Sequence, residues 1–385
     1  MEPEQIKDGY SLETWLDARP ETSRRRDSST LAVRSAARII PFWGRAMDEP
    51  WAWKADATAL PVLRLALIAG VAVVSRTSEI ENAVKTARRA YASVLSASVG
   101  AGSDNRNAIN AASAAAAAAN ENTNFAVEHM AGAFSFVSNL MWEQLRDDLR
   151  MITEERDPLQ LPLWSITRPD WFTQFDAETR AIWSKNPPGA WDFWSRWWDG
   201  VLSGKQLDWE LQRRVALIPD EDWQRGPAHI AAIIVRLEEQ FALRTKIAEL
   251  KETLRAIEVQ LLSQGATAAQ RSHNHPPELV DAPTVIGREV VIAMAALDEA
   301  ETELAKFKSD PLILNRVGSA LLKAAIAITK YWAGLADVIL TKSAEVIGDT
   351  GTKAVIAAVA LNYAPQFGNV GRALLELAAK LAIGG

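Results

Sequence analysis

The stretch "LRTKIAELKETLRAIEVQL", from Leu243 to Leu261, decides the fold class. Its apolar residues alternate steps of four and three positions, which is the spacing of a coiled-coil seam. We expect the residues of this seam to form an interaction surface: Leu243, Ile247, Leu250, Leu254, Ile257 and Leu261. A second apolar seam runs from Val290 to Phe307 and is interrupted by Glu301. The two seams predict an antiparallel coiled-coil hairpin over residues 227–308, formed within one chain or across a dimer.

The segment between the seams, residues 265–284, contains the stretch "RSHNHPPE" from Arg271 to Glu278. His273, His275 and Glu278 have the residue types of a metal site, but such sites hold their histidines on rigid elements. Here the surrounding residues are rich in Ala, Ser, Pro and Gly, and consecutive prolines favour extended backbone. We therefore interpret 265–284 as a flexible linker or a recognition segment, with these three residues only weak metal candidates, and expect no cofactor.

The rest of the chain also favours helices. Strand signals are nearly absent, with no hairpin dipeptide between alternating apolar runs and no alternation of strands with helices. Apolar residues recur at three and four positions through most of the sequence. The sequence thus predicts an all-α protein with a multi-helix N-terminal bundle, a short tryptophan-rich helical module, the coiled-coil hairpin and apolar C-terminal helices.

An alanine-rich helical bundle is predicted over residues 11–155. The run "LPVLRLALIAGVAVVS", residues 60–75, is too short for a membrane span and predicts a buried core helix. Six consecutive alanines, 114–119, predict a close helix crossing because their side chains are small. The start of this bundle is basic, and we interpret its arginines as a solvated face, with an acidic partner as the alternative: Arg24, Arg25, Arg26, Arg34, Arg38 and Arg45.

Ten of the 15 tryptophans lie between Trp142 and Trp223, and they define a tryptophan-rich module over residues 156–226. Trp191, Trp194 and Trp198 are three and four positions apart, so they share one helix face. We interpret the cluster as core filling between short helices. Stacking on a nucleic acid or a sugar is the alternative, but the surrounding aspartates and glutamates oppose a phosphate backbone.

The last segment, residues 311–385, is predicted to form apolar amphipathic helices. Its first helix has a narrow polar stripe, because Arg316, Lys323, Lys330 and Asp337 recur every seven residues. The side chains that would face a membrane, if this segment bound one, are Leu321, Ile326, Trp332, Ile339, Val355 and Leu374. An ordinary buried helical subdomain is the alternative.

Composition excludes several classes of function. The chain has 385 residues, a net charge of −6 and no cysteine, so thiolate zinc sites, iron–sulfur clusters and cysteine nucleophiles are absent. The charge also argues against bulk attraction to nucleic acid. No arrangement of nucleophile, base and acid is recognisable, and no small-molecule substrate is indicated. The acidic N-terminus lacks the apolar core of a secretory signal, so we expect a cytoplasmic protein that acts there or at the inner membrane, on its surface or inserted in it.

Two stretches carry a resemblance to a known family: "WDFWSRWWDGVLSGKQLDWELQRRVALIPDEDWQRGPAHIAAII" and "RSHNHPPE". They resemble a family of helical proteins, seen largely in alphaproteobacteria, that has no assigned activity. Asp192 to Glu278 resemble it well and the N-terminal half resembles it loosely. The resemblance implies a shared front module and a variable C-terminal part, and it assigns no residue a catalytic role.

Three hypotheses for function follow from the sequence. The first is a non-enzymatic interaction or assembly protein that acts through helical contacts as a homo-oligomer or with a protein partner. The second is a membrane-active effector, pore-forming or membrane-perturbing, used in bacterial conflict or phage defence and acting through residues 311–385. The third is an enzyme on a helical scaffold that uses clustered carboxylates such as Asp220, Glu221 and Asp222.

Overall fold

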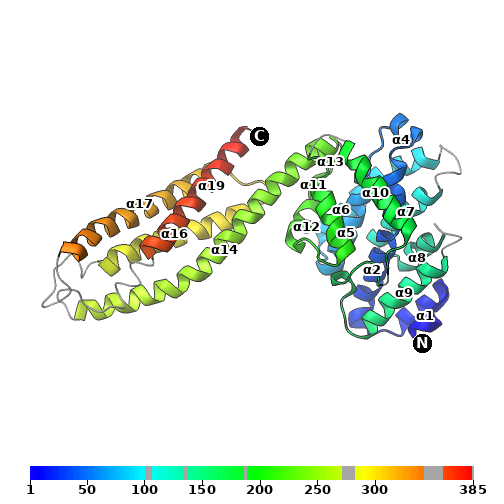
Figure 1. The fold of residues 1–385 in the computed structure, drawn as a ribbon, viewed down its shortest axis with the longest axis horizontal. Coiled ribbons are helices and arrows are strands. Elements are labelled where there is room, and N and C mark those ends of the chain that lie inside the picture. Colours follow the sequence, from blue (N-terminus) through cyan, green and yellow to red (C-terminus); the bar gives the residue numbers. More distant parts are fainter. Residues whose placement is uncertain are drawn as a thin grey trace. The chain divides into compact units, whose positions relative to one another are not determined.

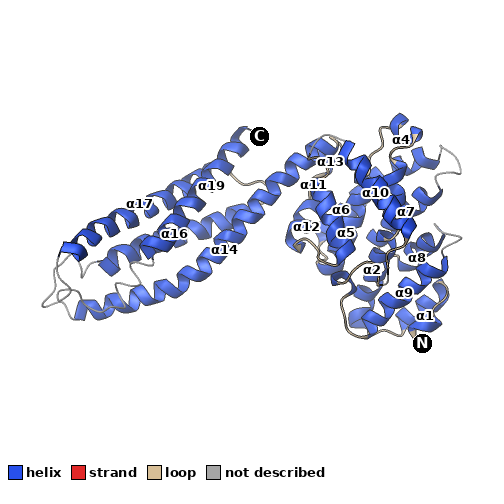
Figure 2. Cartoon of the chain, viewed as in Figure 1, coloured by secondary structure: helices blue, strands red, loops and turns tan. Residues whose placement is uncertain are grey.

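The computed structural model describes residues 1–99, 106–132, 138–165, 167–185, 189–270, 282–341 and 359–383. Within these ranges every regular element is helical, and no strand occurs (Figures 1 and 2). The prediction of an all-α protein is therefore confirmed. The chain divides into two compact units, Met1–Val235 and Arg236–Gly385. The predicted segments 11–155 and 156–226 fall in the first unit and 311–385 falls in the second, whereas 227–308 begins in the first unit and continues into the second.

The first unit contains most of the helices that the structure describes. Its longer helices are α1 (Gly9–Asp17), α2 (Glu21–Ala37), α5 (Leu60–Val74), α6 (Ser78–Val99), α7 (Arg106–Ala119), α8 (Thr123–Gly132), α9 (Ser138–Thr153), α10 (Asp170–Lys185), α11 (Asp192–Ser203) and α12 (Trp209–Ala216). Its shorter elements are η1 (Pro3–Gln5), α3 (Ile40–Ala46), α4 (Pro50–Lys54), η3 (Pro158–Gln160) and α13 (Asp220–Trp223).

Helices α5 and α7 form the centre of the first unit. Residue 60 and residues 62–71 of α5 are buried, as expected of a core helix. Helix α7 packs against α2, α3, α5, α6 and α8. All six alanines of the run 114–119 are buried, which allows several helices to approach α7 closely. The predicted close crossing at the alanine run is confirmed.

The tryptophans of α11 fill the interior of the first unit. Trp194, Trp197 and Trp198 are at most 3% exposed. The indole of Trp197 donates to Gln212 Oε1 at 3.0 Å, and that of Trp198 donates to Asp176 Oδ1 at 2.7 Å. Buried indoles of this kind combine a large apolar surface with one satisfied polar group. The core-filling interpretation is confirmed for these residues.

The second unit is built from α14 (Pro227–Gln270), which begins in the first unit, and from α16 (Ala282–Ala305), α17 (Pro311–Thr341), a π-helical turn (Val359–Tyr363) and α19 (Ala364–Ile383). The four long helices share one apolar core. Residues 265–270 and 282–284 are helical, so both ends of the predicted flexible linker belong to helices. Its middle, residues 271–281, lies outside the described residues.

Helices α17 and α19 pack through glycines. A Cβ atom on Gly318 of α17 would lie 2.8 Å from the carbonyl oxygen of Gly371, and a Cβ on Gly371 would lie 2.8 Å from that of Gly318. The two backbones therefore approach more closely than any side chain at these positions would permit. This reciprocal contact fixes the register of the α17–α19 pair.

Candidate functional site

The predicted interaction seam is buried inside its own unit. Leu243, Ile247, Leu250 and Leu254 of α14 are at most 7% exposed and belong to the core shared with α16, α17 and α19. The side chains of Ile257 and Leu261 lie outside the described residues. The described part of the seam is therefore occupied by helices of the same chain, and its side chains are not presented to a partner.

The predicted membrane-facing residues have different surroundings. Leu321 and Leu374 have no exposed surface and belong to the core of the second unit. Trp332 is partly buried and packs against that core, whereas Ile326 is 53% exposed. The side chain of Ile339 and the whole of Val355 lie outside the described residues. Among the predicted residues whose side chains are described, Ile326 alone presents most of its side chain to solvent.

The weak metal candidates His273, His275 and Glu278 also lie outside the described residues. In the part of the chain that the structure describes, no group of three or more His, Asp or Glu side chains is placed to hold a metal ion.

The clustered carboxylates of α13 form ion pairs. Asp220 lies 2.7 Å from the guanidinium of Arg64, which is 2% exposed and lies over the Trp223 ring. Burial holds the pKa of Arg64 below its ordinary value. Asp222 Oδ1 lies 2.8 Å from His229 Nε2. Two of the three proposed catalytic carboxylates therefore have structural partners.

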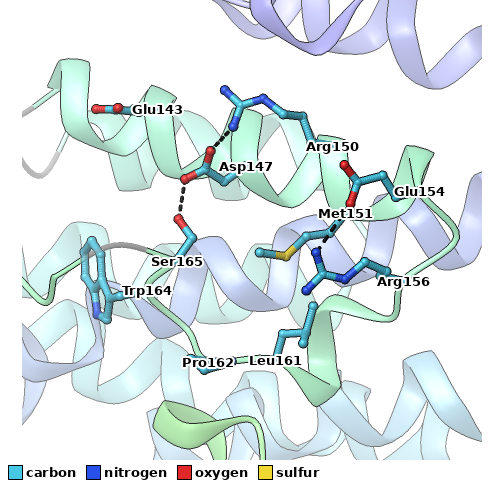
Figure 3. Close-up of a pocket in the computed structure, with 10 residues that line it drawn as sticks. All are labelled: Glu143, Asp147, Arg150, Met151, Glu154, Arg156, Leu161, Pro162, Trp164 and Ser165. Atoms are coloured by element: carbon cyan, nitrogen blue, oxygen red, sulfur yellow. Dashed lines mark hydrogen bonds and ion pairs between the residues drawn. The ribbon is translucent and has the colours of Figure 1, made fainter.

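A groove of about 530 Å³ lies between α9 and the segment that follows it (Figure 3). Helix α9 ends where Glu155 adopts a positive φ of 57°, after which the amide of Arg156 donates to the carbonyl of Met151 at 2.9 Å. This left-handed residue turns the chain back along its own helix. Leu161, Pro162, Trp164 and Ser165 then form the opposite wall of the groove.

Arg34 of α2 holds this wall in place from the buried side. Its guanidinium donates to the carbonyl oxygens of Pro158, Leu161, Pro162 and Leu163 at 2.5 to 3.2 Å. A guanidinium has five donors in a planar fork, which lets one side chain bind several carbonyls of an irregular segment. One arginine thus satisfies four carbonyl groups of this part of the chain.

Asp148 of α9 compensates the charge of two buried arginines. Its carboxylate lies 2.8 Å from Arg34 Nε and 2.7 Å from Arg38 Nη1, and all three side chains are at most 3% exposed. The prediction that the N-terminal arginines form a solvated face is wrong for Arg34 and Arg38. It failed because helical spacing alone did not show that an acid more than one hundred residues away lies opposite them.

The polar side chains of the groove also bind one another. The carboxylate of Asp147 accepts from Ser165 and from Arg150, as the dashed lines in Figure 3 show. Ser165 Oγ also lies 3.1 Å from Gln144 Oε1. Arg150 donates to Glu4 at 2.8 Å, and this hydrogen bond holds the pKa of Glu4 below its ordinary value.

This arrangement is poorly suited to nucleophilic catalysis. A serine nucleophile needs a general base that can take its proton near neutral pH, most often a histidine. Ser165 contacts a carboxylate that already accepts from Arg150, and no histidine lines the described groove. The network holds the groove's walls together. No sequence motif indicated it, because its residues come from α9 and from an irregular segment.

No family model, curated protein or solved structure matches the chain. The roles of these residues therefore rest on their own geometry.

Proposed function

We propose that the protein is a non-enzymatic helical interaction protein that assembles with further copies of itself or with a protein partner. The observation that carries the proposal is on α16. This helix buries Val290, Ala293 and Leu297 in the core of its unit, yet Val291 and Ile292 are 47% and 40% exposed. We interpret these two adjacent exposed branched side chains as the centre of a contact surface, because exposed apolar side chains that lie together favour binding to another protein. A cytoplasmic location is part of the proposal.

The enzyme hypothesis receives less support. The groove beside α9 contains a hydroxyl and a carboxylate, but the carboxylate is engaged by an arginine. Asp220 and Asp222 are engaged by Arg64 and His229. A general acid or base must be free to exchange a proton with a substrate, and these carboxylates are committed to structural contacts.

Chemical crosslinking of the full chain tests the assembly proposal. We expect crosslinks between copies, or to another protein, that map to residues 236–385, both in purified protein and in cells that produce it. Crosslinks confined to single chains under both conditions would contradict the proposal.

A membrane-active function is the second candidate. In the described part of the chain one helical stretch, Pro311–Ala333 of α17, is long and apolar enough to cross a membrane by length and composition, and 39% of its most apolar window is buried. Lys323, Ile326 and Lys330 lie exposed on this helix, and neither lysine forms an ion pair with a described residue. Cations beside exposed apolar side chains favour binding to anionic lipid.

Leakage of dye from vesicles that contain phosphatidylglycerol tests this candidate. The variant K323E with K330E should release less dye than the unchanged protein, because the cations that attract the lipid are reversed. K246E with K308E makes the same change of net charge at exposed lysines outside α17 and serves as the control. Equal leakage from both variants, or none from the unchanged protein, counts against a membrane function.

A further inference from the structure

The outward face of α16 carries an ordered pattern of charge and apolar surface. Arg288, Val291, Ile292, Ala295 and Asp298 are all exposed. At 3.6 residues per turn they lie within about 60° of one line along the helix. Glu299, which is 43% exposed, continues this line. The face is thus basic at its N-terminal end, apolar in its middle and acidic at its C-terminal end.

Because its two ends carry opposite charges, this face is complementary to the same face of a second copy that runs in the opposite direction. If a second α16 is laid antiparallel, with the centre of the contact between Ala293 and Met294, Arg288 lies opposite Glu299 and Ile292 lies opposite Ala295. The same contact is repeated about the two-fold axis, as an isologous dimer requires. A parallel arrangement would instead place Arg288 against Arg288 and the two acidic ends against each other. Repulsion between these like charges disfavours the parallel arrangement.

The contacts within the chain leave this complementarity intact. Arg288 has no ion-pair partner among the described residues. Asp298 binds Lys251 at 2.5 Å and Glu299 binds Arg316, so both carboxylates are held on α16 by the helices beside it. A carboxylate has about four lone-pair positions, so each can accept from a second cation.

We propose that the outward face of α16, which comprises Arg288, Val291, Ile292, Ala295, Asp298 and Glu299, binds the same face of a second copy of this chain in antiparallel orientation. The inference deepens and rests on the proposed assembly function. Val291 and Ile292 form the apolar centre, and Arg288 pairs with the acidic end of the other copy. A contact of one helix face is smaller than a standard stable interface, so the dimer is weak and exchanges readily.

Sedimentation velocity with two charge-reversal variants of the full chain tests this arrangement. R288E places two acids together at each end of the dimer, and E299K places two cations together. Each variant alone should dimerise at least about tenfold more weakly than the unchanged protein. An equimolar mixture of the two should recover the dimer, because every pair across the mixed interface then has opposite charges. K246E, which reverses an exposed lysine on α14, should dimerise as the unchanged protein does.

Each outcome decides the proposal. Loss of dimer in both variants and its recovery in the mixture support the antiparallel α16 contact. Dimers that R288E and E299K leave unchanged overturn it while the assembly function stands, because copies then meet elsewhere. Loss in both without recovery in the mixture overturns the antiparallel arrangement. An unchanged protein that is only monomeric overturns the dimer, and the crosslinking experiment then decides whether a different protein partner exists.

Circular dichroism and thermal unfolding of every variant identify any loss caused by misfolding, and V291D then provides a second test of the same face.

Discussion

The carboxylate of Asp148 lies 2.7 Å from the guanidinium of Arg38, and neither side chain is exposed to solvent. The same carboxylate binds Arg34. One acid on α9 thus binds two arginines, Arg34 within α2 and Arg38 at the C-terminal cap of α2. Removing charges from water is costly, so each buried charge depends strongly on its ion-pair partner. The first unit therefore depends on a contact between residues that lie far apart in the sequence.

Replacement of Asp148 by asparagine should strongly destabilise the first unit. The change leaves two buried cations without a counter-charge, and breaking a buried pair costs about 3–5 kcal/mol. Denaturant unfolding measures this loss. D199N removes an acid that is 63% exposed and pairs with Arg180, so it should cost only about 0–1 kcal/mol. Similar losses in the two variants would show that the buried pair is not critical.

Replacement of Arg34 by lysine should loosen the wall of the groove. An ammonium has three donors and no planar fork, so it cannot reach the four carbonyls and Asp148 together. We expect amide hydrogen exchange to accelerate in residues 158–165. R25K is the control, because the side chain of Arg25 is 51% exposed and pairs with Glu121, outside this segment. Unchanged exchange in R34K would mean that the segment is held by other contacts.

Substitution of Gly318 by alanine should destabilise the second unit by about 1–3 kcal/mol, because the new Cβ would press on the carbonyl of Gly371. Gly287 of α16 has open space where its Cβ would be. The matched change G287A should therefore be neutral or stabilise the helix, by up to about 1 kcal/mol. Thermal unfolding of both variants checks the pair of expectations, and a G318A protein as stable as G287A would contradict the close crossing.

His129 should make stability depend on pH. The side chain is half-buried, its Nδ1 lies 3.1 Å from Asn110 Oδ1, and burial lowers its pKa from the ordinary value of 6.5, which Glu128 partly offsets. The unfolded chain therefore binds a proton more readily than the folded one. The contribution of His129 is complete above pH 6.5 and is lost as the pH falls from there through the folded pKa. As the pH falls over this range, the thermal unfolding midpoint of the unchanged protein should decrease more than that of H129N. Equal decreases in the two proteins would contradict the role of His129.

The sequence predicted the elements whose physical cause is local. The apolar run of α5 and the apolar spacing of α14 are each encoded within a few neighbouring residues. Helix capping is local in the same way, because Asp208 accepts from the amide of Glu210 at 2.8 Å at the start of α12. Periodicity and capping act over one or two turns, so they can be recognised without tertiary information.

The sequence did not show which other residues pack around these elements. A seam has the same spacing whether its partner is another helix of the chain or another chain, and the described part of this seam packs against helices of its own unit. From the sequence alone, Arg34 and Arg38 could not be distinguished from the exposed arginines near them. They are buried because Asp148 of α9 lies against them. The groove beside α9 arises from an irregular segment that no periodic pattern marks.

The mass of the full chain in solution tests the central claim most directly. Light scattering across micromolar concentrations should give a mass above 42.2 kDa that rises toward twice this value as the protein concentration increases. Assembly with further copies through the second unit produces this dependence. A mass of 42.2 kDa at every concentration, in a chain that also forms no crosslinks to other proteins, would contradict the account.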